Sequence, residues 1–122
     1  MLTRILQGRE VSAGDYITMQ RERATLVRAM DARLADLDAL LMPTTPIVAP
    51  KIAEVSTPAT FLPTNALGLR NTSLINFFDL CAISVPVPAA GELPVGLMIV
   101  ARNGQDRKLF RIAAAVEKLF AA

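Results

Sequence analysis

Histidine is absent from these 122 residues, and cysteine occurs once, at Cys81. Without histidine the chain has neither a Ser-His-Asp nor a Cys-His catalytic group, and no imidazole to bind a metal. A single cysteine excludes an intrachain disulfide and a cysteine-based zinc site. We therefore expect no metal site and no cofactor. Cys81 lies in an apolar run, and we interpret it as a buried small hydrophobe.

Long apolar runs and a large excess of one charge are missing as well. The most apolar stretch, residues 80–90, is interrupted by Ser84, Pro86 and Pro88. No stretch approaches the roughly 18 consecutive apolar residues of a membrane helix. Thirteen basic and eleven acidic residues give a net charge of +2, which is too balanced to indicate a nucleic-acid partner. The first residues have no apolar signal core, so we expect a cytoplasmic protein without membrane contact.

Recognisable catalytic groups are scarce. The six glycines are dispersed, so no phosphate-binding loop is present. Asp36 and Asp38 offer a possible carboxylate pair, but exposed charge is ordinary beside a helix end. The three lysines, Lys51, Lys108 and Lys118, lie outside apolar settings. The sequence therefore contains no identifiable nucleophile–base pair, and we assign no catalytic residue.

The N-terminal part has a helical pattern. Residues 1–7 fit the last turns of a helix, with Gly8 as its C-cap. Ser12 and Asp15 have the spacing of a capping box, which predicts a helix start at Ser12. Apolar residues then recur at helical spacing and form one stripe: Tyr16, Met19, Leu26, Val27, Met30, Leu34 and Leu37.

Short apolar segments predict strands at 38–42, 82–87 and 95–101, and the last two are close enough to form a hairpin across a turn at 89–92. The first strand has flanks typical of a parallel sheet. Residues 43–63 hold five of the eight prolines, which predicts an irregular connection. A buried helix is expected over 72–80. A last helix over 107–120, capped by Asp106, has a broad apolar face.

Helices that alternate with apolar strands indicate an α/β fold, with a partial mixed sheet and covering helices. Three short strands make a narrow sheet for so much apolar helix, and the first residues fit the interior of a helix. We therefore expect residues 1–122 to be one segment of a larger domain. Its open sheet edge and apolar helix faces would associate with a missing N-terminal segment or with a second copy of the chain.

Polar residues gather near the predicted strand ends. Thr44 and Thr45 follow the carboxyl end of the first strand, where the ligands of open α/β sheets collect. Thr72 and Ser73 suit a helix N-cap, and Asn76 lies one turn later on the same face. Each residue on its own also fits a structural role, as a helix cap or a loop hydrogen bond. Together they fit the polar edge of an apolar ligand cavity.

Four motifs, in order, resemble the C-terminal part of amidase-signature enzymes, a family that includes amide hydrolases and the A subunit of glutamyl-tRNA amidotransferase. GREVSAGDY at 8–16 resembles G-x-x-[IV]-S-A-x-D-Y, and DALLMPTTP at 38–46 resembles D-[AV]-L-L-x-P-T-x-P. RNT at 70–72 precedes AISVP at 82–86, which resembles A-[IL]-S-V-P. LPVGLMIVA at 93–101 resembles L-P-V-G-L-Q-[LI]-V-[GA]. The resemblance covers essentially all of the sequence.

The resemblance implies a fragment of the amidase-signature fold and a Ser–cis-Ser–Lys triad that cleaves a small amide through an acyl-enzyme. The triad belongs to a Gly/Ser-rich signature and an upstream lysine, and no segment like Gly-Ser-Ser-Gly-Gly occurs here. The chain would then supply the core and one wall of the substrate pocket of a C–N bond hydrolase, and would be inactive alone. The pocket residues implied are Leu69, Ser73 and Asn76, with Thr72, Thr44 and Thr45 as further candidates.

One departure from the family pattern bears on the substrate. Many members have Gly-Leu-Pro before the AISVP strand, where this chain has Asp79, Leu80 and Cys81. This favours a free small-amide hydrolase over the tRNA-linked subunit. Two other interpretations remain open. One is a binding or assembly module derived from the amidase fold without catalysis, and the other is an enzyme of unrelated chemistry that uses Asp79 and Lys51.

Overall fold

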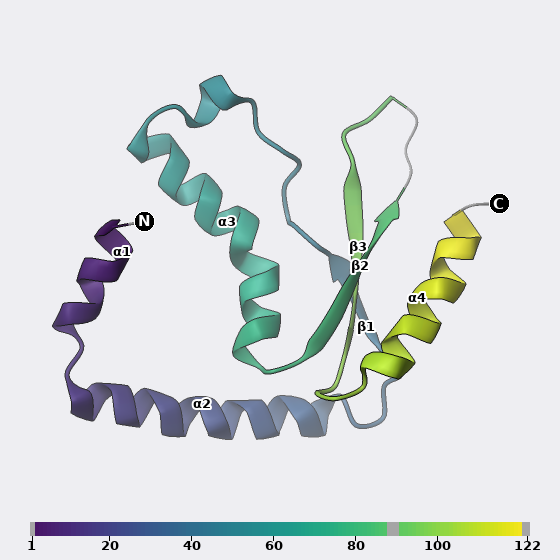
Figure 1. Ribbon diagram of the computed structural model, residues 1–122, viewed down its shortest axis with the longest axis horizontal. Helices are drawn as coiled ribbons and strands as arrows, with labels where there is room; N and C mark the ends of the chain where they lie inside the picture. Colours follow the sequence, from purple (N-terminus) through teal and green to yellow (C-terminus); the bar gives the residue numbers. More distant parts are fainter. Residues whose placement is uncertain (1, 88–90, 121–122) are drawn as a thin grey trace.

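The computed structural model describes residues 2–87 and 91–120. These residues form an α/β arrangement of helices and strands, as the sequence predicts (Figure 1). The helices are α1 (Leu2–Gln7), α2 (Ala13–Arg33), α3 (Pro58–Phe77) and α4 (Asp106–Phe120), and the strands are β1 (Leu40–Pro43), β2 (Cys81–Val87) and β3 (Val95–Ala101). Two short 3₁₀ turns, η1 (Gly8–Glu10) and η2 (Ile52–Val55), precede α2 and α3.

The strands form one antiparallel sheet in the order β1-β3-β2. The predicted β2–β3 hairpin is confirmed, with Cys81 opposite Ala101. β1 pairs with the other side of β3, where Leu40 lies opposite Val100. The parallel pairing expected for residues 38–42 is therefore wrong. β1 and β2 do run in the same direction, but the tight hairpin places β3 between them.

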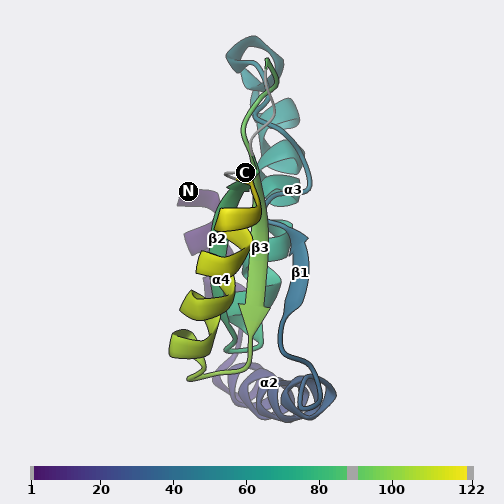
Figure 2. The ribbon, with the colours of Figure 1, turned by 90° about the vertical axis from the view of Figure 1, so that its right-hand side faces the viewer.

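The core is built on β3, which has a strand on each side and a helix on each face. Figure 2 shows α3 and α4 on opposite faces of the sheet. On the α4 face, Ile99 packs in one cluster with Leu109 and Ala113. On the α3 face, Val100 packs with Ile75. Burial on both faces explains why the sequence of β3 is apolar almost throughout instead of alternating with polar residues.

The predicted helix start at Ser12 is confirmed, although the capping box is incomplete. Ser12 is the N-cap of α2, and its Oγ accepts a hydrogen bond from the Asp15 N–H (3.1 Å). The short Asp15 carboxylate accepts from the Ser12 hydroxyl (2.6 Å), where the longer Glu of a full capping box would reach the backbone. Gly8 does not cap α1 in a left-handed conformation, because the chain continues directly into η1.

α3 begins at Pro58, well before the predicted start at Thr72. Thr57 is the N-cap, and Pro58 takes the first helical position, where a missing N–H has no cost. Pro63 lies in the second turn and removes one backbone hydrogen bond, which the helix tolerates. Thr72 and Ser73 therefore lie inside the helix and are not its N-cap. The density of prolines predicted an irregular segment up to residue 63, but Pro58 and Pro63 occupy positions that this helix tolerates.

The helices are less buried than their apolar composition predicts. α3 buries Ile75 but leaves Leu74 and Phe77 exposed, so it is not covered nearly all round. In α4 only one side packs on the sheet, and Phe110 is 64% exposed. Asp106 is the first residue of α4 and not its N-cap. The apolar stripe of α2 is largely exposed as well, at Tyr16, Met19 and Leu26, and so is Leu37 beyond the end of the helix.

Part of the predicted turn between β2 and β3 can be placed. Residues 89 and 90 lie outside the described residues, whereas Gly91 has a φ of +77°, in the left-handed region that glycine adopts without strain.

Among the residues that the structure describes, no helix is both long enough and apolar enough to cross a membrane.

Candidate functional site

Two hydroxyl groups meet above the central strand at Gly96. Thr44 directly follows β1, where its N–H donates to the Gly96 carbonyl (2.8 Å), and Ser84 lies on β2. Thr44 Oγ1 and Ser84 Oγ are 2.5 Å apart and form a hydrogen bond. A Cβ at position 96 would lie 2.7 Å from Thr44 Oγ1 and closer still to Ser84 Oγ. The missing side chain at Gly96 therefore makes room for both hydroxyls.

These hydroxyls border a hollow of about 220 Å³ between the sheet and α3. The hollow brings together three of the sequence-predicted residues, Thr44, Thr72 and Asn76, with an apolar floor from α3 and β3. Sequence reasoning did not assign Ser84 to the site. The available signal was that Ser84 is the one polar residue in the predicted strand 82–87. A polar side chain in an otherwise apolar strand needs a partner or a function.

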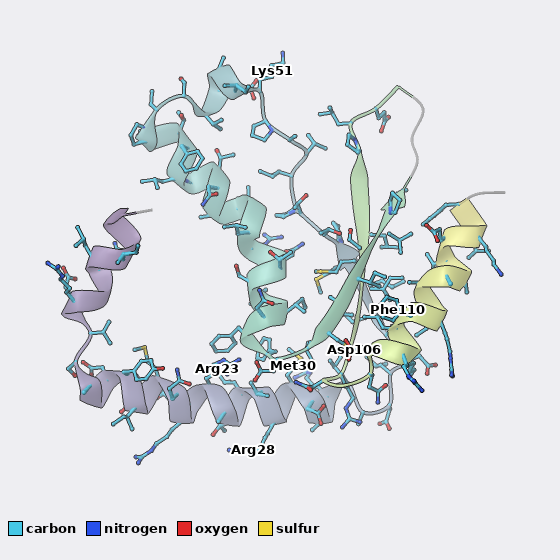
Figure 3. All side chains as sticks on the ribbon, viewed as in Figure 1. Arg23, Arg28, Met30, Lys51, Asp106 and Phe110 are labelled. Atoms are coloured by element: carbon cyan, nitrogen blue, oxygen red, sulfur yellow. The ribbon has the colours of Figure 1, made fainter. Side chains whose placement is uncertain are left out.

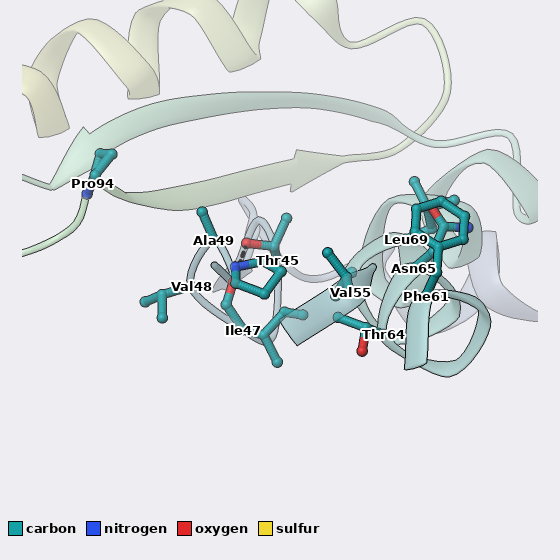
Figure 4. A pocket seen from close by; sticks show the side chains of 12 residues that line it. Thr45, Ile47, Val48, Ala49, Val55, Phe61, Thr64, Asn65, Leu69 and Pro94 are labelled. Atoms are coloured by element: carbon teal, nitrogen blue, oxygen red, sulfur yellow. Dashed lines mark hydrogen bonds between the residues drawn. The ribbon is translucent and has the colours of Figure 1, made fainter. Parts of the chain in front are cut away.

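A larger cavity of about 410 Å³ lies between α3 and the segment that follows β1 (Figure 4). It is lined by two more of the predicted residues, Thr45 and Leu69. Leu69 also borders a third hollow, which it shares with Ser73. The six predicted residues thus lie along α3 and the segment that faces it, but they are divided among three hollows. Leu69 and Ser73 do not share a hollow with Asn76.

Asn71 positions the segment that carries Thr44 and Thr45. Its side chain is buried, and Nδ2 donates to the Pro43 carbonyl (2.7 Å), which ties the end of β1 to α3. Loss of this bond would leave the N–H of the buried Asn71 amide without its partner, at a cost of about 1–3 kcal/mol. Sequence reasoning noted the RNT motif but did not give Asn71 a role. The available signal was a polar amide one turn before the apolar Ile75 on the same helix face.

Asp79 determines how α3 ends beside the hollow. The Asp79 N–H donates to the Asn76 carbonyl (3.2 Å) and the Leu80 N–H to the Ile75 carbonyl (3.2 Å), which is a Schellman motif. Asp79 has a φ of +54°, in the left-handed region that favours glycine. This is the position at which the Gly-Leu-Pro pattern has its glycine. Asp79 keeps that backbone turn and adds a carboxylate to it.

The Asp79 carboxylate connects the end of α3 to α2. It forms an ion pair with Arg23, and Figure 3 shows Arg23 between α2 and the C-terminal end of α3. The Arg23 guanidinium also lies 5.7 Å from the centre of the Phe77 ring and donates to the Asn76 carbonyl (3.4 Å). The Asp79 carbonyl accepts a hydrogen bond from Asn103 Nδ2 (2.7 Å). The backbone carbonyl of Asn76 therefore accepts hydrogen bonds from Arg23 of α2 and from Asp79, just after α3.

Two further ion pairs connect α2 and the segment after it to the rest of the molecule. Arg102 donates to Asp31 through Nε (2.7 Å) and Nη2 (2.6 Å). These hydrogen bonds lower the pKa of Asp31 and raise the pKa of Arg102. Lys108 Nζ lies 2.8 Å from Asp38 Oδ1, and this hydrogen bond lowers the pKa of Asp38. Asp38 thus has a structural partner, which argues against a catalytic pair with Asp36.

The hollow offers hydrogen-bonding groups without charge. Cys81 is half-buried, and its S–H donates to the Arg102 carbonyl (3.1 Å). The alternative enzyme of unrelated chemistry would need Asp79 and Lys51 to lie together. Asp79 pairs with Arg23, whereas Figure 3 places Lys51 at the opposite end of α3, so the two side chains do not meet. Within residues 2–87 and 91–120, no group of three or more His, Cys, Asp or Glu side chains could hold a metal ion. The hydroxyls and amide can hydrogen-bond a neutral polar ligand.

The Amidase family model matches residues 2–110, and the chain belongs to this family. The match includes both strands of the hairpin, the whole of α3, and the segment between β1 and α3. All the sequence-predicted pocket residues lie within it.

The relatives that the chain matches are longer proteins, and the match covers a part of each. It is 37% identical over 120 residues to 2-amino-5-chloromuconic acid deaminase of Comamonas testosteroni, a match that covers 95% of this chain and 25% of that protein. It is 41% identical over 85 residues to the A subunit of the glutamyl-tRNA(Gln) amidotransferase of Thermotoga maritima, over 70% of this chain and 17% of that protein. The crystal structure of that Thermotoga maritima protein matches with a TM-score of 0.69 at 35% identity, over 95% of this chain and 26% of the crystallised chain. The chain therefore spans about a quarter or less of the length of these relatives.

Proposed function

We propose that the chain is the C-terminal portion of an amide (C–N) bond hydrolase and supplies the core and one wall of its substrate pocket. Membership of the Amidase family supports this class of reaction. The observation that carries the proposal is that Thr44, Ser84 and Asn76 meet at one hollow beside the strand ends. Uncharged hydroxyl and amide groups suit a neutral amide, whose carbonyl accepts hydrogen bonds and whose N–H donates them.

The bond-breaking groups of the proposed enzyme are a lysine and two serines outside this sequence. The lysine accepts a proton from the first serine, which accepts the proton of the second. The second serine Oγ attacks the amide carbonyl carbon, the C–N bond breaks, and the amine leaves with a proton. Water then hydrolyses the acyl-enzyme to a carboxylic acid and restores the serine. The substrate-facing residues of this chain bind and orient the amide: Leu69, Thr72, Ser73, Asn76, Thr44 and Thr45, together with Ser84.

The catalytic segment is the partner that we assign to this chain. Tyr16 and Ile17 of α2, and Leu62 and Leu74 of α3, are each about half exposed. Their burial against a partner contributes roughly 25 cal/mol per Å² of apolar surface. A second copy of the chain is the alternative cover for these faces. A small amide is the substrate of the whole enzyme, which acts in the cytoplasm.

A chimera tests the proposal. In it, this chain replaces the matched segment of the Comamonas testosteroni deaminase, and ammonia release is measured from the deaminase's own substrate and from acetamide and phenylacetamide. We expect the folded chimera to release ammonia from one of them and the isolated chain to release none. Turnover by the isolated chain, retained through successive purification steps, would overturn the proposal, as would a folded chimera without activity.

Two variants of the chimera locate the effect. Ser84→Ala removes one hydroxyl from the hollow, and we expect kcat/KM to fall about tenfold, the equivalent of one hydrogen bond. Leu119→Ala, on the exposed side of α4, serves as the control, because it changes a side chain away from α3 and should leave kcat/KM unchanged. Equal effects of the two substitutions would contradict a role for the hollow in substrate binding.

A non-catalytic binding or assembly module derived from the amidase fold is the second candidate. It is favoured by the closed core on β3, where every buried side-chain nitrogen and oxygen atom of the described residues has a hydrogen-bond partner. A folded chimera without activity, together with a stable monomeric chain in sedimentation, is the result that this candidate predicts.

A further inference from the structure

The cavity between α3 and the segment after β1 has walls from four parts of the chain. Ile47 and Val48 come from the segment after β1, Val55 comes from η2, and Phe61 and Leu69 come from α3. Figure 4 shows these side chains around the cavity, with Pro94 at its other side. The lining is predominantly apolar, and no charged side chain is among the described residues that form it. A charged group placed there would lose its hydration without a compensating partner.

Of the three polar side chains of this cavity, Asn65 can face a ligand, whereas those of Thr45 and Thr64 form hydrogen bonds within the protein. Thr45 Oγ1 donates to the Ile47 carbonyl (2.9 Å), and Thr64 Oγ1 donates to the Thr60 carbonyl (2.8 Å). Both hydroxyl protons are therefore already engaged, and what these residues present to the cavity is mainly their methyl groups. A ligand group that fits this environment is uncharged and apolar.

Gly68 is the unusual residue in the wall. It lies in the interior of α3, where glycine is less favourable than alanine by roughly 0.5–1 kcal/mol. Neither a positive φ nor close packing requires it, because a Cβ at this position would meet only Ile47 Cδ1, at an ordinary 4.0 Å. The consequence of glycine here is an open wall, since any longer side chain would project into the cavity.

The size and position of the cavity define what it can hold. Its volume of about 410 Å³ lies in the range of small-molecule sites. An engineered cavity of about 150 Å³ is already large enough for benzene. The cavity also adjoins the polar hollow, because Thr45 lines the first and its neighbour Thr44 lines the second. An amide bound at the hollow can therefore extend an apolar group toward Gly68.

We infer that this cavity is the specificity pocket for an aryl or branched alkyl group of the amide substrate, and that Gly68 sets the size of the group accepted. The inference rests on the proposed function for the polar end of the ligand. It assigns the substrate to arylalkyl or branched aliphatic amides, and it excludes charged side groups from this end.

Binding of two probes to the 122-residue chain tests the inference without any need for turnover. Phenylacetamide and acetamide are titrated into isotope-labelled chain, and amide chemical shifts are followed by NMR. We expect phenylacetamide to shift the signals of residues 45–50 and 61–69 saturably, with intermolecular NOEs from its ring protons to Ile47 and Val55. Acetamide at the same concentrations should bind at least about tenfold more weakly, because it lacks the apolar group.

Two substitutions at one position provide the variant and its control. Gly68→Leu fills the cavity while favouring the helix, and we expect it to weaken phenylacetamide binding at least about tenfold. Gly68→Ala favours the helix equally but adds one methyl group at an ordinary contact, and binding should change less than about threefold. Equal binding of the two probes, absence of NOEs to Ile47 and Val55, or full binding by Gly68→Leu would each overturn the inference.

The two proposals fail separately. An active chimera in which Gly68→Leu leaves the preference for phenylacetamide over acetamide unchanged would overturn the specificity pocket and leave the proposed function intact. Cavity-dependent binding of phenylacetamide by the chain, together with a folded but inactive chimera, would overturn the proposed hydrolase and retain an apolar binding site.

Discussion

β3 and α2 both contain many apolar residues, but those of β3 are mostly buried whereas those of α2 are mostly exposed. In β3, Ile99 and Val100 are fully buried, because α4, α3 and two neighbouring strands surround them. In α2, Tyr16 is 57% exposed and Leu26 is 48% exposed. Leu34, at the end of α2, is buried. The rest of the helix is connected to the molecule through the ion pairs of Arg23 and Asp31.

The sheet and α2 are thus held in the molecule by different kinds of interaction. The sheet and its two helices gain their stability from buried apolar surface, which has no charge to titrate or to be screened. α2 depends on solvent-accessible ion pairs, which are weak and are screened by salt. The apolar stripe of α2 is thus left largely exposed, and the proposed function assigns it to contact with a catalytic segment.

The largest expected effect is on the β3 core. Ile99→Ala should lower the free energy of unfolding by about 2–5 kcal/mol, because it leaves a cavity between the sheet and α4. Leu26→Ala, in the exposed stripe of α2, should change it by no more than about 0.5 kcal/mol. Urea denaturation of both variants measures the contrast. If Leu26→Ala cost as much as Ile99→Ala, the stripe of α2 would be covered in solution and the distinction between the two regions would fail.

A smaller effect is expected where α2 meets α3. Asp79→Ala removes the ion pair with Arg23 and, like the wild type, keeps a β-carbon at a φ of +54°, so it should destabilise the chain by about 1 kcal/mol. Asp79→Gly loses the same ion pair but relieves the backbone, and we expect its unfolding free energy to stay within about 0.5 kcal/mol of wild type. Denaturation curves decide between them. Equal losses would mean that the ion pair, and not the backbone conformation, dominates at this position.

The smallest effect is the pH dependence of the bidentate pair. The pKa of Asp31 is lowered from 3.8, chiefly by the hydrogen bonds from Arg102. Because the folded pKa lies below the unfolded one, the pair contributes stability above the unfolded value, and this contribution is lost as pH falls through the folded value. NMR titration of the Asp31 carboxyl should give a midpoint below 3.8 in wild type and a higher one in Arg102→Gln. Equal midpoints would show that the pair does not form in solution.

Much of the fold was predictable because its signals are local. The strand at 95–101 and the hairpin with residues 82–87 follow from apolar segments of strand length, and Ser12 marks the start of α2 through its spacing from Asp15. The start of α3 was not predictable from composition. The cluster of prolines indicated an irregular segment, whereas Thr57 as N-cap and Pro58 at the first helical position begin a helix there.

The candidate site was predictable only in part. Thr44, Thr72 and Asn76 were proposed from their places beside strand and helix ends, and the structure does bring them to one hollow. Ser84 and Gly96 were missed, because their roles appear only when β1 and β2 are placed on either side of β3. No local pattern predicts that two hydroxyls 40 positions apart will meet above a glycine.

The sequence by itself determined the family and the main strands, since motifs and hydrophobic periodicity are properties of neighbouring residues. Only the tertiary structure decided the antiparallel order β1-β3-β2, the division of the predicted pocket residues among three hollows, and the open wall at Gly68. These features depend on the register of strands and on the packing of a helix against a distant segment. Such contacts are set by the shapes that meet across the fold, not by the spacing of residues along the chain.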